Sequence, residues 1–452
     1  MKITLIYPAI GNYEDEARME PLSVGALAGL TPPDVEVALY DDRIEPIPFD
    51  EPTDLVGITV QIYSAKRSYQ IAAEFRKRGV PVIMGGMHPT LIPEEALEHA
   101  DSILINDAEG IWHQVLEDAR RGRLRRIYRG EPHIPQPDTL TRRDLYKDGK
   151  YLPISLLQFG RGCRFTCTFC ATSTYFTHTH YHRSIDRVLR EIEDQKRKFI
   201  FFVDDNMISD IAAAKELFRA LIPLKIRWVS QASINMTRDR ELMSLMVKSG
   251  CLGNVIGFES INPSTLRGMK KNQNLSTGYE VYAEAIEVLR DYGLQTWAAF
   301  TVGHDGDTPD SIRRTLDFAL ENKFTFAAFN ILLPYPGTPL YAKLQAENRL
   351  MYEGKWWLHP DYRYNHAAFH PSHMTADELT HWSFHARRNF NSISSILRRV
   401  TDFKTNMRNP LRFGVYLAYN PLFRKETLKK QGIQLARLAP FQSAGPVDKA
   451  EA

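Results

Sequence analysis

Cysteine is scarce in this chain: four occur among 452 residues, at positions 163, 167, 170 and 251. So few cysteines cannot staple a protein of this length, which excludes a secreted domain built on a disulfide framework. Long apolar runs are also missing. No stretch approaches the 18 or more apolar residues of a transmembrane helix, and the mean hydropathy is −0.34. The first apolar run has only five residues, too short for a secretory signal, so we expect a cytoplasmic protein.

A strong excess of charge of one sign is absent as well. Lys and Arg number 57 and Asp and Glu number 54, giving a net charge of +3. This near balance excludes a nucleic-acid clamp that works through bulk charge, and no specific nucleic-acid partner is expected. Hydrophobic residues at 43% and charged residues at 25% are ordinary globular values, so global disorder is excluded too. At roughly 150 residues per domain, the length predicts about three domains.

Residues 1–130 alternate short β-branched apolar runs with amphipathic stretches, the pattern of a parallel βα sheet. The apolar positions after Ala65 recur at helical spacing, and Gly79 is placed as a helix stop. The fold class we predict is α/β, beginning with a doubly wound, Rossmann-like domain. Its ligands should bind where the strands end. The expected strands are 3–8, 35–41, 55–60, 80–86 and 102–106, and the expected rim is 8–12, 59–64, 85–89 and 106–110.

A proline-rich stretch around residues 131–150 predicts a linker. The alternation then resumes over 151–345, which predicts a partial (β/α)6 barrel with catalytic residues at the strand ends. Residues 346–452 predict a mainly helical region that is aromatic and basic. Thr375 followed by Glu378 has the spacing of a helix capping box. The expected barrel strands are 154–160, 198–206, 226–233, 254–260, 296–303 and 326–336.

Three cysteines fall in one short loop, GRGCRFTCTFC. Cys163, Cys167 and Cys170 can hold three irons of a 4Fe-4S cluster and leave the fourth iron without a protein ligand. The alternative is a structural Cys3His zinc site that takes its histidine from HTHYH, residues 178–182. That alternative would make the chain a zinc-stapled module that binds nucleic acid. Cys251 is expected to be a small buried hydrophobe.

The cysteine spacing, with the aromatic Phe169 before the last cysteine, resembles the radical S-adenosylmethionine (SAM) superfamily. The resemblance implies that the cluster's open iron binds SAM and that SAM is cleaved to a 5′-deoxyadenosyl radical. It also implies SAM contacts at the ends of the barrel strands, although Asp204, Asp205 and Asn206 also fit a turn and a helix cap. The implied cofactor-binding residues are Phe169, Asp204, Asp205, Asn206, Ser230, Gln231, Glu259 and, through its backbone, Gly303.

An α/β domain ahead of such a barrel resembles the cobalamin-binding class of that superfamily, which includes methylases and an anaerobic ring cyclase. The segment 80–112 carries the resemblance, because Gly85 and Gly86 end a strand where a large ligand could approach the backbone. The motif Asp-X-His-X-X-Gly, whose histidine ligates cobalt in many cobalamin proteins, is missing. The alternative is a domain that serves only as scaffold. Residues expected to face the corrin are Thr59, Gln61, Tyr63, Ser64, Gly85, Gly86, Met87 and His88.

Together these features predict a radical SAM enzyme that uses cobalamin to methylate an unactivated centre. Radical cyclisation or rearrangement without methyl transfer is the alternative. The expected partners are a small, lipid-like or tetrapyrrole-like substrate and an electron donor such as flavodoxin or ferredoxin. The aromatic run 356–369 either walls the substrate site or packs a small domain onto the barrel. Residues 396–437 carry ten Lys or Arg and two acids, which fits contact with a membrane surface or with an acidic substrate, or a solvated helix face.

Overall fold

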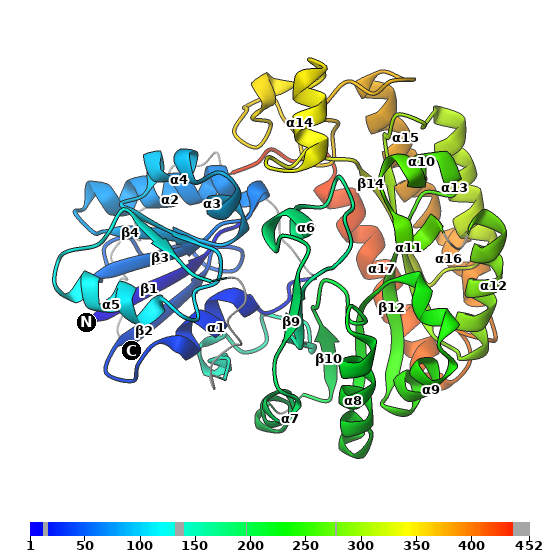
Figure 1. Cartoon of the computed structure of the whole chain (residues 1–452), viewed down its shortest axis with the longest axis horizontal. Helices are drawn as coiled ribbons and strands as arrows, with labels where there is room; N and C mark the ends of the chain where they lie inside the picture. Colours follow the sequence, from blue (N-terminus) through cyan, green and yellow to red (C-terminus); the bar gives the residue numbers. More distant parts are fainter. Residues whose placement is uncertain (12–16, 132–139, 196, 276–277, 437–452) are drawn as a thin grey trace, which may run out of the picture.

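Two six-stranded parallel sheets organise the molecule. In the computed structural model, which describes residues 1–11, 17–131, 140–195, 197–275 and 278–436, the N-terminal sheet and the barrel-like sheet stand side by side, and the C-terminal helices lie mainly against the second (Figure 1). This arrangement confirms the predicted α/β class. The proline-rich residues 132–139 and the C-terminal residues 437–452 lie outside the described residues.

The N-terminal sheet has the strand order β2-β1-β3-β4-β5-β6. Helices cover both of its faces, so β5 is buried along its whole length, as expected of a parallel sheet in a doubly wound fold. The strand β6 was not predicted. The strands are β1 (Lys2–Tyr7), β2 (Glu36–Asp41), β3 (Leu55–Thr59), β4 (Val82–Gly85), β5 (Ser102–Ile105) and β6 (Ile127–Arg129). The helices are α1 (Leu22–Leu30), η1 (Ile62–Ser64), α2 (Ala65–Lys77), α3 (Met87–Leu91), α4 (Pro93–His99), α5 (Trp112–Arg120) and η2 (Arg143–Leu145).

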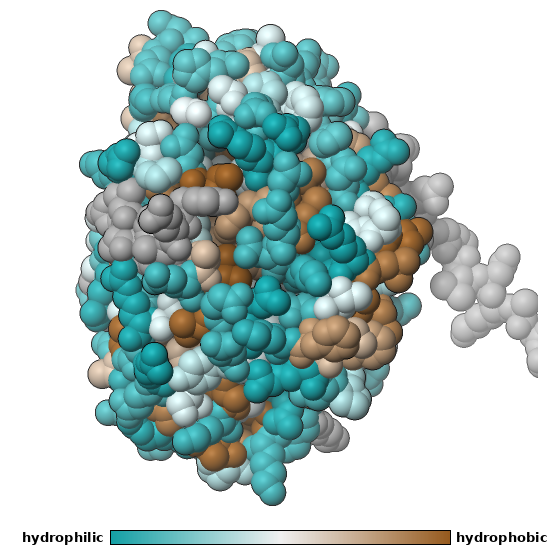
Figure 2. Space-filling view, turned by 90° about the vertical axis from the view of Figure 1, so that its right-hand side faces the viewer, coloured by the Kyte–Doolittle hydropathy of each residue, from teal (hydrophilic) through white to brown (hydrophobic). Residues whose placement is uncertain are grey.

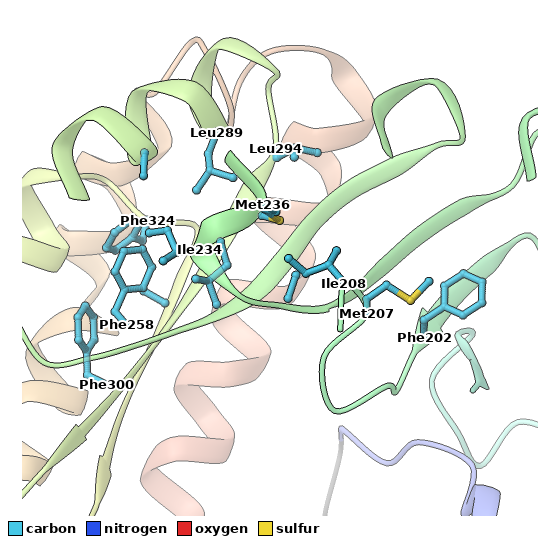
Figure 3. Close-up of a cluster of buried hydrophobic side chains, with 14 of the residues drawn as sticks. Phe202, Met207, Ile208, Ile234, Met236, Phe258, Leu289, Leu294, Phe300 and Phe324 are labelled. Carbon is cyan, nitrogen blue, oxygen red and sulfur yellow. The ribbon is translucent and has the colours of Figure 1, made fainter. Parts of the chain in front are cut away.

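The second sheet has the order β14-β13-β12-β11-β10-β7 and forms the partial barrel. Its outer face packs against helices through a core rich in Phe, Ile, Leu and Met, part of which Figure 3 shows around Phe258, Phe300 and Phe324. The strands are β7 (Ser155–Leu157), β10 (Phe199–Phe202), β11 (Arg227–Ala232), β12 (Cys251–Glu259), β13 (Gln295–Val302) and β14 (Phe326–Ile331). The helices are α7 (Ile185–Asp194), α8 (Ile211–Leu221), η3 (Ile222–Leu224), η4 (Ile234–Arg238), α9 (Arg240–Lys248), α10 (Pro263–Gly268), α11 (Asn272–Leu275), α12 (Gly278–Asp291) and α13 (Pro309–Glu321).

The predicted strand 154–160 is divided in two. β7 ends at Leu157, and β8 (Gly160–Gly162) turns away to pair with β9 (His180–His182) as a small antiparallel hairpin. The short helix α6 (Ala171–Tyr175) lies between these two strands in the chain. The cysteine loop is therefore carried by a separate hairpin that stands beside the main sheet (Figure 1).

The C-terminal region is helical, as predicted. The expected capping box between Thr375 and Glu378 starts the helix α15 (Ala376–Phe390). Its basic stretch is only partly a surface feature. Arg399 is fully buried and donates to the carbonyls of Phe324 and Thr325, and the buried Arg412 donates to the carbonyl of Leu252. These guanidinium groups tie the helices to the barrel strands. The elements are α14 (Pro339–Ala346), η5 (Tyr352–Gly354), α15 (Ala376–Phe390), α16 (Ile393–Val400) and α17 (Pro410–Lys430).

The aromatic run 356–369 packs against the N-terminal domain. Trp356, Trp357 and Tyr362 are buried in one cluster with residues of β3, β4 and α2. Packing therefore accounts for these three side chains, which also contact the barrel, since Trp356 Nε1 donates to the Pro334 carbonyl at 3.0 Å just after the last barrel strand. No helix in the described part of the chain combines the length and apolar character needed to cross a bilayer.

Candidate functional site

All three loop cysteines line one cavity of about 250 Å3 at the carboxyl ends of the barrel strands. Cys167 is buried, and Cys163 and Cys170 are half-buried. Burial raises the pKa of the Cys167 thiol to about 11. Bonding to iron removes that proton. Three cysteines that line one cavity are a donor set that suits an iron–sulfur cluster. The cavity is also lined by Phe169, Asp205, Asn206, Gln231 and Glu259, five of the residues predicted from the sequence.

Two neighbouring aspartates fix the hairpin that carries the cysteines. Asp204 is buried, and its two carboxylate oxygens accept hydrogen bonds from the backbone N–H groups of Phe159 and Gly160. Asp205 accepts from the Gly162 N–H at 2.8 Å and from the Thr172 hydroxyl at 3.2 Å. Burial raises the pKa of Asp204 to about 7. Asp204, which the sequence placed at the SAM site, is thus a backbone anchor outside the cavity lining, whereas Asp205 both anchors the loop and lines the cavity.

Glu259 points into the cavity from the end of β12. Its φ is +61°, and the pairing of β12 with β13 shifts register between Gly257 and Glu259, as at a β-bulge, which re-aims the side chain. One carboxylate oxygen accepts from Lys271 Nζ at 2.8 Å and the other from the Thr301 hydroxyl at 2.5 Å. Burial lowers the pKa of Lys271, but attraction to Glu259 and to Cys167 outweighs it and raises that pKa above its ordinary value. Lys271 and the three cysteines therefore line the same cavity, and the raised pKa favours the charged form of the lysine.

Two polar atoms near the cysteines are buried without a hydrogen-bond partner among the described residues: Asn206 Nδ2 and Gln273 Oε1. Both residues line the cavity, and the other end of the Gln273 amide lies 3.8 Å from Cys167 Sγ. Buried polar atoms are normally satisfied, so one unmet donor and one unmet acceptor fit a polar ligand in this space. SAM carries amino, carboxylate and hydroxyl groups that can meet such a pair. The chemistry of the lining thus suits a cluster and SAM.

Lys271 and Gln273 line the cavity but were not predicted from the sequence. They follow α10, twelve and fourteen residues after Glu259, and no local pattern marks them. Conversely, two predicted residues besides Asp204 lie outside the cavity lining. Ser230 is fully buried on the helix-facing side of β11 and accepts from Asn254 Nδ2 at 2.8 Å. Gly303, proposed to meet adenine through its backbone, already donates its N–H to Asp307 at 2.9 Å.

A second cavity of about 190 Å3 opens at the carboxyl edge of the N-terminal sheet. It is lined by three of the predicted residues, Thr59, Gly85 and Gly86, and by Gly57. Gly86 has φ +103°, and a Cβ there would lie 3.1 Å from the Val60 carbonyl, so the position requires glycine. A Cβ on Gly85 would meet nothing closer than 3.7 Å. The absent side chains leave backbone exposed to the cavity, which fits close approach by a large ligand such as part of cobalamin.

The hairpin of the cysteine loop reaches this second cavity. Arg161 lines it and forms ion pairs with Asp107 at 3.2 Å and Glu109 at 2.5 Å, both from the loop after β5. Tyr175, at the end of α6, lines it too. Since Cys163 is only two residues from Arg161, the segment 161–175 forms part of the wall of both cavities. Neither Arg161 nor its ion pairs with Asp107 and Glu109 were predicted from the sequence.

A third cavity of about 200 Å3 lies nearby, between the ends of β1 and β3 and the C-terminal segment. Thr59 and Ser64 line it together with Tyr63, Tyr364 and Arg43. Ser64 is buried, and its hydroxyl closes a turn with the backbone of Gln61.

His88, expected on the rim, is buried, and its Nε2 contacts Tyr69 and Glu95. After β2, the position that holds the histidine in the Asp-X-His-X-X-Gly motif is occupied by Arg43. Its guanidinium forms an ion pair with Asp41.

Residues 157–319 match the family model of the radical SAM superfamily. The chain is 32% identical over 355 residues to bacteriochlorophyllide d C-8(2)-methyltransferase of Chlorobaculum tepidum, covering 73% of this chain and 77% of the relative. It belongs to the radical SAM superfamily, in the class of cobalamin-dependent methyltransferases and anaerobic cyclases. Bacteriochlorophyllide d C-12(1)-methyltransferase of the same organism is 29% identical over 84% of both chains.

Solved radical SAM structures share the fold. That of TsrM from Kitasatospora setae with cobalamin and a [4Fe-4S] cluster bound has a TM-score of 0.62 at 18% identity, covering 76% of this chain and 78% of that one. OxsB with aqua-cobalamin bound has a TM-score of 0.61 at 15% identity, covering 94% and 71%. The prediction of a radical SAM enzyme of methyltransferase type is confirmed. Cobalamin is bound in both of these solved structures, which share the fold of this chain. Membership of the radical SAM superfamily also argues against the alternative interpretation of the cysteines as a structural zinc site in a nucleic-acid-binding module.

Proposed function

We propose that this radical SAM protein methylates an unactivated carbon on the periphery of a tetrapyrrole of the chlorin type. Relatives at 29% and 32% identity are named as bacteriochlorophyllide methyltransferases, and they match most of this chain. A hopanoid C-2 methylase from Rhodopseudomonas palustris is more distant, at 22% identity. This ranking supports a flat, conjugated ring system over a saturated polycyclic lipid as the substrate.

The observation that carries the proposal is the shared wall between the two cavities. Arg161 lines the cavity of the N-terminal domain, and Cys163 lines the cysteine cavity. When bound, the cluster supplies the electron that cleaves SAM, and cobalamin supplies the methyl group. Methyl transfer to an unactivated carbon needs the radical and the methyl donor within reach of the same substrate atom. One continuous segment, residues 161–175, lines both cavities, and this supports such an arrangement.

The chain's own residues perform positioning and exclusion of water. Asp204 and Asp205 hold the cysteine hairpin through four hydrogen bonds, and Lys271 offsets negative charge inside the cysteine cavity. Tyr63 and Tyr364, whose ring centroids are 5.0 Å apart, provide an aromatic wall in the third cavity. Aromatic faces of this kind suit a planar conjugated substrate.

The experiment is a turnover assay with anaerobically reconstituted protein, SAM labelled in its methyl group, cobalamin, and reduced flavodoxin or ferredoxin. A bacteriochlorophyllide should gain the label, with S-adenosylhomocysteine and 5′-deoxyadenosine formed in equal amounts. A hopanoid in place of the tetrapyrrole should gain none. Formation of 5′-deoxyadenosine alone, with an altered but unmethylated tetrapyrrole, would instead support cyclisation or rearrangement.

A further inference from the structure

Exposed apolar side chains gather in one part of the described chain. Seven of its ten exposed large hydrophobic residues lie between residues 393 and 428. Phe403 is 73% exposed, Ile393 63% and Leu397 62%, which is unusual for side chains of this size. We call the surface formed by the following five residues the α16–α17 corner: Ile393, Leu397, Phe403, Met407 and Leu411.

The corner is rigidly supported. Ile393 and Leu397 are one helical turn apart on α16, and the buried Arg399 holds the opposite side of that helix through the carbonyls of Phe324 and Thr325. The Tyr416 hydroxyl on α17 donates to the Ile396 carbonyl at 2.7 Å, which joins the two helices. The exposed side chains are therefore held outward by a buried polar framework.

This region lies on the side of the molecule away from the N-terminal domain (Figure 1). Figure 2 looks onto that side, where brown apolar side chains are scattered among teal hydrophilic ones and several lie near the right-hand edge. A group of exposed apolar side chains surrounded by polar residues often marks an interaction site.

Within the stretch 393–428, every exposed charged residue is a cation. All residues from 393 to 428 are described, and their exposed charged members are Arg398, Lys404, Arg408 and Lys425. The two acids of the stretch, Asp402 and Glu426, are buried and paired with Arg290 and Lys430. On the neighbouring helix α12, Glu287 and Asp291 pair with Lys404, so this cation contributes less than the others.

We propose that the α16–α17 corner docks on a membrane surface that contains anionic lipid. Apolar side chains that protrude beside cations insert at the boundary between headgroups and acyl chains, while the cations face the anionic headgroups. A second copy of the chain is the alternative occupant, and the oligomeric state of the parent and of the corner variant distinguishes it from a membrane. The inference concerns a surface remote from both cofactor cavities and does not depend on the proposed substrate.

The test is vesicle flotation with the full-length protein. Vesicles of phosphatidylcholine with 30% phosphatidylglycerol should carry the protein, pure phosphatidylcholine vesicles should carry several-fold less, and 0.5 M NaCl should release it. The triple variant Ile393→Ser/Leu397→Ser/Phe403→Ser should lower the bound fraction at least fivefold without changing the thermal midpoint, since all three side chains are exposed. The variant Arg398→Glu should weaken binding to the anionic vesicles only.

The matched control replaces exposed apolar residues elsewhere, at Leu140, Ile211 and Ile222, whose exposures are 37–39%. That control should bind vesicles like the parent. The inference is overturned if the parent does not float with the anionic vesicles, or if both triple variants lose binding equally. It is also overturned if light scattering shows a dimer that only the corner variant dissociates, because the corner would then be a contact between copies.

Discussion

Lys271 lies 2.8 Å from Glu259 in the cavity lined by the three loop cysteines. Both side chains are about nine-tenths buried, so neither charge is well solvated. A buried ion pair is seldom retained for stability alone, because the loss of solvation offsets most of the attraction. Here the pair leaves a cation beside the cysteine sulfurs, where a bound cluster and the SAM carboxylate bring negative charge.

We therefore expect Lys271→Met to weaken SAM binding by at least tenfold while the iron content stays that of the parent. Equilibrium dialysis of labelled SAM against anaerobic, cluster-loaded protein measures the affinity. The control is Lys270→Met, which removes an exposed cation one residue away. The double variant Glu259→Gln/Lys271→Met avoids an unpaired buried carboxylate. Parent-like SAM affinity in the folded double variant would show that the pair only stabilises the fold.

The cluster assignment makes a second prediction. Cys167→Ala should abolish retention of iron and the associated visible absorbance, because two thiolates hold a cubane cluster poorly. Cys251→Ala should keep full iron content, since Cys251 is buried at the start of β12 and does not line the cysteine cavity. Iron and sulfide analysis after anaerobic reconstitution distinguishes the two variants. Equal iron in both would remove Cys167 from the ligand set.

Most strands could be predicted from the sequence because each is a dense run of β-branched and aromatic residues. The strand β6 could not, since Ile127–Arg129 has only three residues in a basic context. The site was harder to predict. Ser230 and Gln231 both end β11, and side chains alternate faces along a strand, so only Gln231 lines the cavity. Lys271 reaches Glu259 through a tertiary fold that local patterns do not encode.

The glycines of the second cavity give a third prediction. Gly85→Leu should lower cobalamin retention at least tenfold, because the new side chain would enter the cavity from a position with no neighbour closer than 3.7 Å. Iron content should be unchanged. Gly414→Leu is the control, since nothing lies within 4 Å of a Cβ there. Cobalamin extracted from both proteins, measured by absorbance, decides the outcome. Equal retention would indicate that cobalamin does not use this cavity.

A buried carboxylate joins the N-terminal domain to the C-terminal segment and gives a pH prediction. Glu95 accepts hydrogen bonds from Trp357 at 2.9 Å and Tyr69 at 3.0 Å and contacts His88 at 3.1 Å. Burial raises the pKa of Glu95, but the bonds from His88 and Trp357 outweigh it and lower that pKa from 4.5 to about 2. The stabilisation is therefore present above pH 4.5 and is lost as the pH falls toward 2.

Glu95→Gln should accordingly lower the free energy of unfolding at pH 7 by about 2 kcal/mol, the scale of a hydrogen bond to a charged group. The difference from the parent should shrink below pH 4.5, because Glu95 of the unfolded chain then takes up a proton while the folded carboxylate stays ionised until the pH nears 2. Urea unfolding followed by tryptophan fluorescence measures it, with the exposed Glu98→Gln as control. A difference that stays constant down to pH 3 would contradict the ionised state of Glu95.

The last prediction concerns the wall between the cofactor cavities. Arg161 is held by Asp107 and Glu109 of the N-terminal domain, and it directly precedes the cysteine loop. Arg161→Met should loosen the placement of one cavity relative to the other. In the proposed arrangement SAM is cleaved within the cysteine cavity, so cleavage should continue, whereas methyl transfer uses both cavities and should fall about tenfold.

The measurement is the ratio of methylated product to 5′-deoxyadenosine in the same reaction. This ratio separates a positioning role from a general folding defect, which would lower both products together. Because Arg161→Met leaves two buried carboxylates without their cation, Arg161→Met/Glu109→Gln is made alongside it to reduce that cost. Asp118→Asn, at a buried acid of the same domain remote from the wall, is the control and should keep the parent ratio. An unchanged ratio in both Arg161 variants would show that the ion pairs do not set the geometry of methyl transfer.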